Sequence, residues 1–421
     1  MQTIEIKEGI HLHTIKNNKF KTDLTAVFIT FPLDRKHVTT DALIPCILRR
    51  GTSYMATQDE ISKHLEEQYG ASFDCGVEKV GDNHVIKLYI ESVNDNFLPE
   101  QDNLIKKVID TMFQIILDPL LEQGKFKEDY VTGEKNNLRR IIESKIDNKE
   151  QYAVDGLIQT MYKDMPYGLY KYGYIDDLEK ISNDDIYNRY LELLKIAKFD
   201  VYISGDFDEN RILDTVQENM KKLEGRIPQF VINNEETETK ELVQDITETV
   251  EHLNVSQGKL IIGLDVLNTI KNSRFAISLY NVIMGESPTS KLFQNVREKA
   301  SLAYVARSTY LRQKSNIFIK CGIEIENYKK AVEIIKEQLE TMKNGEFSED
   351  DIEVAKKYMV NGIKTVEEEQ DAQITYYIGQ ELSGYNLSLE EYKENISKIT
   401  KEDIVNIAKN VQINSIYFLR D

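Results

Sequence analysis

The six histidines are the first residues to consider for metal chemistry, because histidine and carboxylate side chains at helical spacing bind zinc. They are His11, His13, His37, His64, His84 and His252. None stands in a His-Glu-x-x-His pattern or its inverse, so local spacing indicates no helical zinc site. His11 and His13 would share one face of a strand, but no third ligand is evident beside them. The sequence therefore favours histidines with structural roles.

The cysteines and the glycine motifs give equally little catalytic signal. Cys46, Cys75 and Cys321 are too few and too scattered for a disulfide framework or a cysteine-rich zinc site. A buried structural thiol is commoner than a cysteine nucleophile. The segment 285–291 lacks the second glycine of a phosphate-binding loop, and the chain contains no Gly-x-Ser-x-Gly elbow.

Composition excludes some partners. The chain has 421 residues, of which 53 are basic and 71 acidic, giving a net charge of −18, and 41% are hydrophobic. Nucleic acids and anionic membranes require clustered positive charge, so neither is expected as a main partner. No apolar run approaches the roughly 18 residues of a membrane span, and no signal peptide is apparent. We expect a folded cytoplasmic protein with several hydrophobic cores.

An internal repeat indicates how these cores are organised. Residues 181–186 and 399–404 both read Ile-(Ser/Thr)-x-(Asp/Glu)-Asp-Ile, and each leads into a helical pattern and then a strand. In both segments the hydroxyl side chain can cap the helix, and the acids lie in its first turn. A weaker second repeat relates residues 69–90 to residues 300–323. Two repeats in the same order predict a duplicated domain.

Each half mixes strands and helices, which predicts an α+β fold of two similar tandem domains. Residues 24–31 indicate a strand, and apolar residues at helical spacing indicate helices over 105–116 and 331–342. Ser348 with Asp351 resembles a helix cap. The polar, acidic segment 233–241 is the best linker candidate. We therefore predict domains at 1–224 and 246–421, joined by a linker at 225–245.

One long stretch resembles a known family. Residues 285–304 read Gly-Glu-Ser-Pro-Thr-Ser-Lys-Leu-Phe-Gln-Asn-Val-Arg-Glu-Lys-Ala-Ser-Leu-Ala-Tyr. They resemble the second-domain signature of the insulinase-like (M16) zinc peptidases, the family of pitrilysin and the mitochondrial processing peptidase. Residues 255–263 and 345–356 resemble neighbouring segments of that domain. The resemblance implies two sheets, each packed against helices, as in the LuxS/MPP-like metallohydrolase fold.

The same resemblance implies that the zinc site has been lost. The family places His-x-x-Glu-His on a helix of the first domain, before a Gly-Thr turn, with a further glutamate downstream. Here the matching positions hold Ala42, Pro45 and Cys46, and Ile141 stands where the third ligand would be, although Glu134 is kept. Alanine and isoleucine cannot bind a metal and proline cannot act as a base, so we predict no metal in this chain.

Arg297 and Tyr304 match an Arg/Tyr pair that, in the family, reaches the substrate from the second domain. A guanidinium and a phenol can donate hydrogen bonds to a peptide carbonyl or a carboxylate. Such bonds orient a substrate but do not replace a catalytic metal. The alternative is an arginine paired with Glu298 on a helix surface and a tyrosine in the core.

Together these features favour a non-catalytic, substrate-binding subunit of a heterodimeric peptidase. Its partner would be a similar chain that carries the zinc, and its substrate a peptide. A catalytically dead peptide-binding or scaffold protein, serving peptide maturation or export, is one alternative. A peptidase with an unconventional metal site that uses His11, His13 or His37 is the other.

Overall fold

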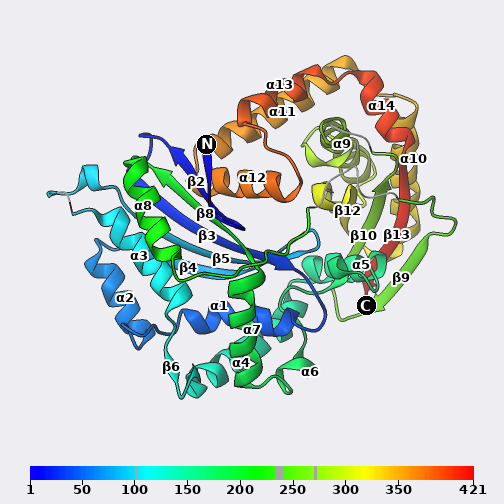
Figure 1. Ribbon diagram of the computed structural model, residues 1–421. Coiled ribbons are helices and arrows are strands. Elements are labelled where there is room, and N and C mark those ends of the chain that lie inside the picture. Colours follow the sequence, from blue (N-terminus) through cyan, green and yellow to red (C-terminus); the bar gives the residue numbers. More distant parts are fainter. Residues whose placement is uncertain (101, 233–239, 270–272) are drawn as a thin grey trace. The chain divides into compact units, whose positions relative to one another are not determined.

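The computed structural model describes residues 1–100, 102–232, 240–269 and 273–421. These residues form two compact units, each of which combines one large β-sheet with helices (Figure 1). The predicted α+β class is confirmed. Among the described residues, no helix combines the length and the apolar character needed to cross a membrane.

The first unit is built on a six-stranded sheet with the order β1-β2-β8-β3-β5-β4. Strands β2 and β8 are parallel, and the other neighbouring pairs are antiparallel. The bounds of these strands are β1 (Gln2–Lys7), β2 (Ile10–Lys16), β3 (Thr22–Pro32), β4 (Ser72–Val80), β5 (Asn83–Val93) and β8 (Lys198–Gly205). A separate two-stranded ribbon consists of β6 (Leu121–Glu122) and β7 (Lys125–Phe126). The strand predicted at 24–31 is the centre of β3.

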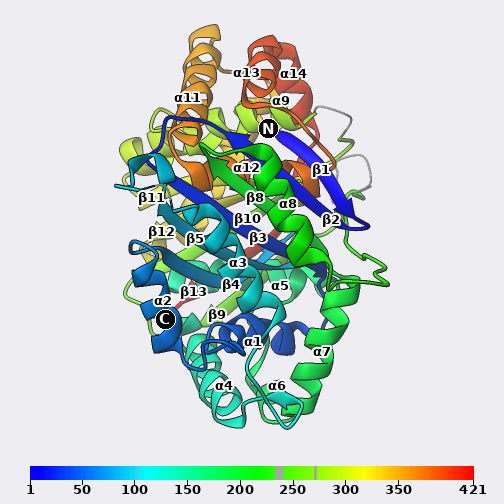
Figure 2. The ribbon, with the colours of Figure 1, turned by 60° about the vertical axis from the view of Figure 1, so that its left-hand side comes forward.

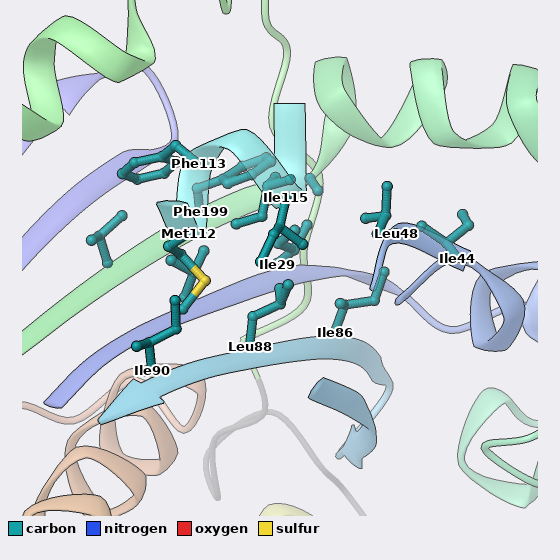
Figure 3. Close-up of a cluster of buried hydrophobic side chains, with 14 of the residues drawn as sticks. Ile29, Ile44, Leu48, Ile86, Leu88, Ile90, Met112, Phe113, Ile115 and Phe199 are labelled. Carbon is teal, nitrogen blue, oxygen red and sulfur yellow. The ribbon is translucent and has the colours of Figure 1, made fainter. Parts of the chain in front are cut away.

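Helices of the first unit bury an apolar core against this sheet. They are α1 (Val38–Leu48), α2 (Gln58–Glu67), α3 (Leu104–Leu117), α4 (Glu128–Glu143), α6 (Ile175–Leu178), α7 (Asn183–Ile196) and α8 (Glu209–Met220). Helices α1, α3 and α8 contact the sheet (Figure 2). Figure 3 shows side chains of α1 and α3, such as Leu48 and Met112, against Ile29, Leu88 and Phe199 of the strands. Full burial of one such side chain contributes about 1.5–3 kcal/mol.

The second unit has a five-stranded sheet with the order β11-β12-β10-β13-β9. Its strands are β9 (Thr247–His252), β10 (Gly258–Val266), β11 (Ala303–Leu311), β12 (Asn316–Ile323) and β13 (Val411–Arg420). Its helices are α5 (Lys149–Met161), α9 (Ser273–Asn281), α10 (Tyr328–Lys343), α11 (Glu349–Glu367), α13 (Leu389–Lys398) and α14 (Lys401–Lys409). Two π-helical segments, Val282–Glu286 and Phe293–Lys299, follow α9.

The two sheets repeat one arrangement of strands. In each, a parallel pair (β2 and β8, or β9 and β13) is continued by three antiparallel neighbours, and the first unit adds β1 at its edge. Helices α7 and α14 precede equivalent strands, and both begin with a capping box, at Ser182 and at Thr400. The predicted duplication is confirmed, because both sequence repeats fall on equivalent elements.

The compact units are not continuous halves of the chain. Residues 145–168, which contain α5, belong to the second unit. Residues 370–378, at the start of α12 (Gln370–Leu382), belong to the first, where the Gln370 amide donates to the Ser204 and Thr22 carbonyls. The predicted domains, 1–224 and 246–421, differ from these units because a helix can cover a sheet distant in sequence. The predicted linker, 225–245, includes residues 233–239, which lie outside the described residues.

Candidate functional site

Helix α1 carries the residues that match the family's zinc helix. The helix is buried along almost its whole length, and the Ala42 side chain is only 1% exposed. Pro45 lies inside the helix, where it cannot donate a hydrogen bond to the carbonyl four residues earlier. Cys46 is therefore the one position of the three whose side chain has a possible donor atom for a metal.

The surroundings of Cys46 keep its thiol protonated. Burial, with a smaller effect from the nearby Glu134 carboxylate, raises the pKa of Cys46 to about 11. Glu134 lies on α4, and both of its carboxylate oxygens already accept hydrogen bonds, from Arg50 Nη1 at 3.3 Å and Asn137 Nδ2 at 3.2 Å. Because metals bind the thiolate, this set of side chains does not fit a zinc ion.

Cys75 on β4 adds a second thiol near α1 without changing this conclusion. Its Sγ donates to the Pro45 carbonyl at 3.4 Å, and burial raises the pKa of the thiol to about 12. Ile141, matched to the family's third ligand, is 38% exposed on α4 and has no donor atom. Neither thiol has the lowered pKa of a cysteine nucleophile.

His11 and His13 do share one face of β2, as their spacing indicated. Their ring centroids are 6.1 Å apart, and both approach Oδ1 of buried Asp200, with His13 Nε2 at 3.1 Å and His11 Nδ1 at 3.7 Å. The Lys198 ammonium pairs with the same carboxylate, which opposes a second cation there. His37 lies elsewhere, hydrogen-bonded to Asp34 at 2.9 Å before α1. The sequence did not reveal Asp200, which is distant from both histidines along the chain.

Arg297 and Tyr304 come together at an exposed position of the second unit. Arg297 lies in the π-helical segment Phe293–Lys299, and its guanidinium carbon is 4.5 Å from the centroid of the Phe293 ring and 5.8 Å from that of Tyr304. Its Nε is 3.9 Å from Glu298, at the limit of an ion pair. Tyr304 is 78% exposed, so it is not the core aromatic of the alternative interpretation.

A β-bulge places Tyr304 outside the core. Ala303 of β11 is paired with Ile323 of β12, whereas Val305 is paired with Gly322, so Tyr304 is the extra residue. Bulges interrupt the alternation of a strand and redirect a side chain. Ala303 is only 9% exposed, in contrast to its neighbour. No sequence pattern indicated this bulge or the position of the Phe293 ring beside the guanidinium.

The resulting geometry can bind an acceptor but supplies no reactive group. The guanidinium lies over the Phe293 ring, and its N–H groups can donate hydrogen bonds to carbonyl or carboxylate oxygens. The Tyr304 phenol adds one further donor. The pair brings together hydrogen-bond donors and contains no carboxylate, imidazole or thiol, so the site is suited to hold a substrate.

Comparison with known proteins gives the family. The model of the family described as "Peptidase M16 inactive domain" matches residues 180–359. A protein of Bacillus subtilis named "Probable inactive metalloprotease YmfF" is 34% identical over 98% of this chain and 96% of its own length. The chain belongs to the M16 peptidase family. An "Uncharacterized zinc protease YmfH" of the same organism is 22% identical to this M16 chain, over 72% of the chain and 70% of its own length.

Solved structures agree with the fold of this M16 chain. The crystal structure of a conserved protein from Enterococcus faecalis is 25% identical, with a TM-score of 0.89, and the match covers 100% of this chain and 98% of that one. An M16 inactive domain from Pseudomonas fluorescens has a TM-score of 0.78 at 16% identity, over 100% and 98% of the two chains. The M16 fold inferred from residues 285–304 is thereby confirmed.

Proposed function

We propose that this chain is the non-catalytic, peptide-binding subunit of a heterodimeric zinc-dependent peptidase. One observation carries the proposal. The positions of the zinc helix hold Ala42, Pro45 and a protonated thiol, whereas Arg297 and Tyr304 lie exposed and adjacent. A chain that keeps the substrate-binding donors and lacks the metal ligands is suited to assist a partner that has them.

The relatives support such a pairing. Bacillus subtilis has two proteins similar to this chain, one named as an inactive metalloprotease and one as a zinc protease. The proposed partner is a zinc-bearing M16 chain of similar size. In the complex, Arg297 and Tyr304 would hold a peptide carbonyl or carboxylate while the partner's metal performs hydrolysis.

The test is peptide cleavage by the purified chain mixed with its zinc-bearing partner. Arg297→Ala is expected to lower kcat/KM by about 10- to 100-fold, because a hydrogen bond to a charged group contributes about 1.5–3 kcal/mol. Arg139→Ala is a matched control, since Arg139 is similarly exposed and lies 3.6 Å from Glu179. Equal cleavage by the Arg297→Ala and wild-type mixtures would contradict the proposal.

The same experiment distinguishes the two alternatives. A scaffold protein would bind peptide and produce no cleavage, with or without the partner. A peptidase with an unconventional metal site would cleave peptide alone and would purify with stoichiometric metal in elemental analysis. The His11, His13 and Asp200 cluster is the place for such a metal, and His13→Ala would then remove it.

A further inference from the structure

The sheet of the second unit has one face on which α5 packs, and three basic side chains lie on the same face beside the apolar cluster. Ile261 of β10 and Phe318 of β12 belong to the cluster buried by α5. Side chains two residues apart on a strand point the same way, so Lys259 and Lys320 lie on this face too. Arg307 of β11 is paired with Lys320 in the register and therefore joins them. We call Lys259, Arg307 and Lys320 the basic patch.

Two of these cations are directly opposed. Like charges facing each other across antiparallel strands destabilise the sheet. Arg307 is partly compensated by Glu150 of α5, whose carboxylate lies 2.5 Å from Arg307 Nη2. Lys320 is half-buried, and its ammonium forms no hydrogen bond or ion pair with any residue that the structure describes. Burial lowers the pKa of Lys320; the Glu150 carboxylate opposes this effect, and the Arg307 charge adds to it to a smaller extent.

The third member of the patch, Lys259, also has no carboxylate partner among the residues that the structure describes. Lys259 Nζ donates to the neutral Gln257 Oε1 at 2.9 Å. Lys259 is paired with Gly322 of β12 in the strand register. Glycine has no side chain, so no side chain of β12 lies directly opposite Lys259. Within the described part of the chain, the patch thus sets three cations against one paired carboxylate, that of Glu150, in a protein whose net charge is −18.

The patch includes one residue, Arg307, of the strand that carries Tyr304, β11. Arg307 follows Tyr304 by three residues on the same strand, a separation of about 10 Å along β11. An extended peptide advances by the same rise per residue. A peptide group held at Tyr304 would therefore bring a side chain about three residues away to Arg307 and Lys320.

We infer that the basic patch binds an acidic side chain of the peptide, about three residues from the peptide group at Arg297 and Tyr304. The inference rests on the proposed peptide-binding function and names its substrate class, an acidic peptide. A carboxylate placed between Arg307 and Lys320 supplies the half-buried ammonium with its missing partner. It also relieves the repulsion between the two cations.

The experiment measures binding of fluorescein-labelled peptides to the full chain alone, by fluorescence anisotropy. One peptide alternates glutamate with serine, and its counterpart has glutamine in place of glutamate. The wild-type chain is expected to bind the glutamate peptide about tenfold more tightly, with a preference that falls as salt rises. Lys320→Gln is expected to remove this preference. Lys336→Gln, on the exposed surface of α10 outside the patch, serves as the control.

A second variant is expected to increase the affinity for the glutamate peptide, a result that misfolding would not produce. Glu150→Gln removes the carboxylate that competes for Arg307, so this variant is expected to bind the glutamate peptide more tightly than wild type. Equal binding of the two peptides by wild type, or an unchanged preference in Lys320→Gln, would overturn the inference. This assay needs no partner and no turnover. The two proposals can therefore fail separately. If the chain prefers the glutamate peptide but Arg297→Ala leaves cleavage by the mixture with the partner unchanged, the acidic-peptide site is supported and the subunit proposal is rejected.

Discussion

At the scale of single residues, burial and hydrogen-bonding partners determine the chemistry more than residue type does. Cys46 is a potential ligand by type, yet its surroundings raise the pKa of the thiol to about 11. The residue type of Arg297 does not distinguish it from other surface arginines, but its guanidinium lies over the Phe293 ring and near the Tyr304 ring. The first residue loses reactivity through its environment, and the second gains a defined orientation for binding.

The raised pKa of Cys46 predicts how the rate of alkylation of its thiol depends on pH. In the folded chain, its reaction with iodoacetamide is expected to rise about tenfold per pH unit from pH 7 to 10 without a plateau, because only the thiolate reacts. Since the folded pKa lies above the unfolded value, the unfolding free energy should fall as pH rises above about 8.5. Mass spectrometry of the modified peptide measures the rate.

The urea-unfolded chain is the control for this measurement. There the Cys46 rate should level off above about pH 8.5, the pKa of an unperturbed thiol. A plateau below pH 9 in the folded chain would show that the thiol is not held protonated.

At the scale of elements, irregular segments position the residues of the site. A π-helical segment carries Arg297, and a β-bulge exposes Tyr304 at the start of β11. Such departures from regular geometry occur frequently at functional sites. Helix α5 contributes in a different way, by covering one part of a sheet face and leaving the basic patch open.

The packing of α5 on β13 can be tested with two glycines. A Cβ at Gly156 would lie 2.4 Å from Tyr417 Cζ, and the Tyr417 ring is buried, with its hydroxyl bonded to Glu251. Gly156→Ala is therefore expected to lower the free energy of unfolding by about 1–3 kcal/mol. Gly133 in α4 has no atom within 4 Å of such a Cβ.

Gly133→Ala is therefore the matched control for this substitution. It is expected to raise stability by up to about 1 kcal/mol, through helix propensity alone. Urea denaturation of both variants gives the comparison. Stabilisation by Gly156→Ala would show that α5 does not pack closely against Tyr417.

At the scale of the whole molecule, each unit depends on a segment from outside its own half of the sequence. The second unit includes residues 145–168, whose Leu157 packs in one cluster with Ile261, Phe318 and Tyr417. A sheet face of this kind must be covered by apolar side chains to exclude water. Each compact unit therefore combines most of one half of the sequence with a short segment of the other.

This dependence predicts the behaviour of a fragment. Residues 240–421 expressed alone lack α5 and should expose the cluster around Phe318 and Tyr417, which increases the fluorescence of bound ANS relative to the intact chain. Adding a synthetic peptide of residues 145–168 should lower that fluorescence. A fragment that binds no more ANS than the intact chain would contradict the role given to α5.

Much of the fold followed from local sequence. The capping boxes at Ser348 and Thr400, the helical spacing of residues 331–342 and the β-formers of 24–31 each identified an element that the structure contains. These signals are readable because they depend on neighbours within about one helical turn or on strand alternation.

The sequence by itself determined the family and the loss of the metal ligands, because residue type alone decides that Ala42 and Pro45 cannot bind zinc. Only the tertiary structure decided which unit α5 belongs to, that Asp200 faces His13, and that Arg307 pairs with Glu150 and lies opposite Lys320. These contacts join residues far apart in the chain. They depend on strand register and on which sheet face a helix covers, and no local pattern encodes either one.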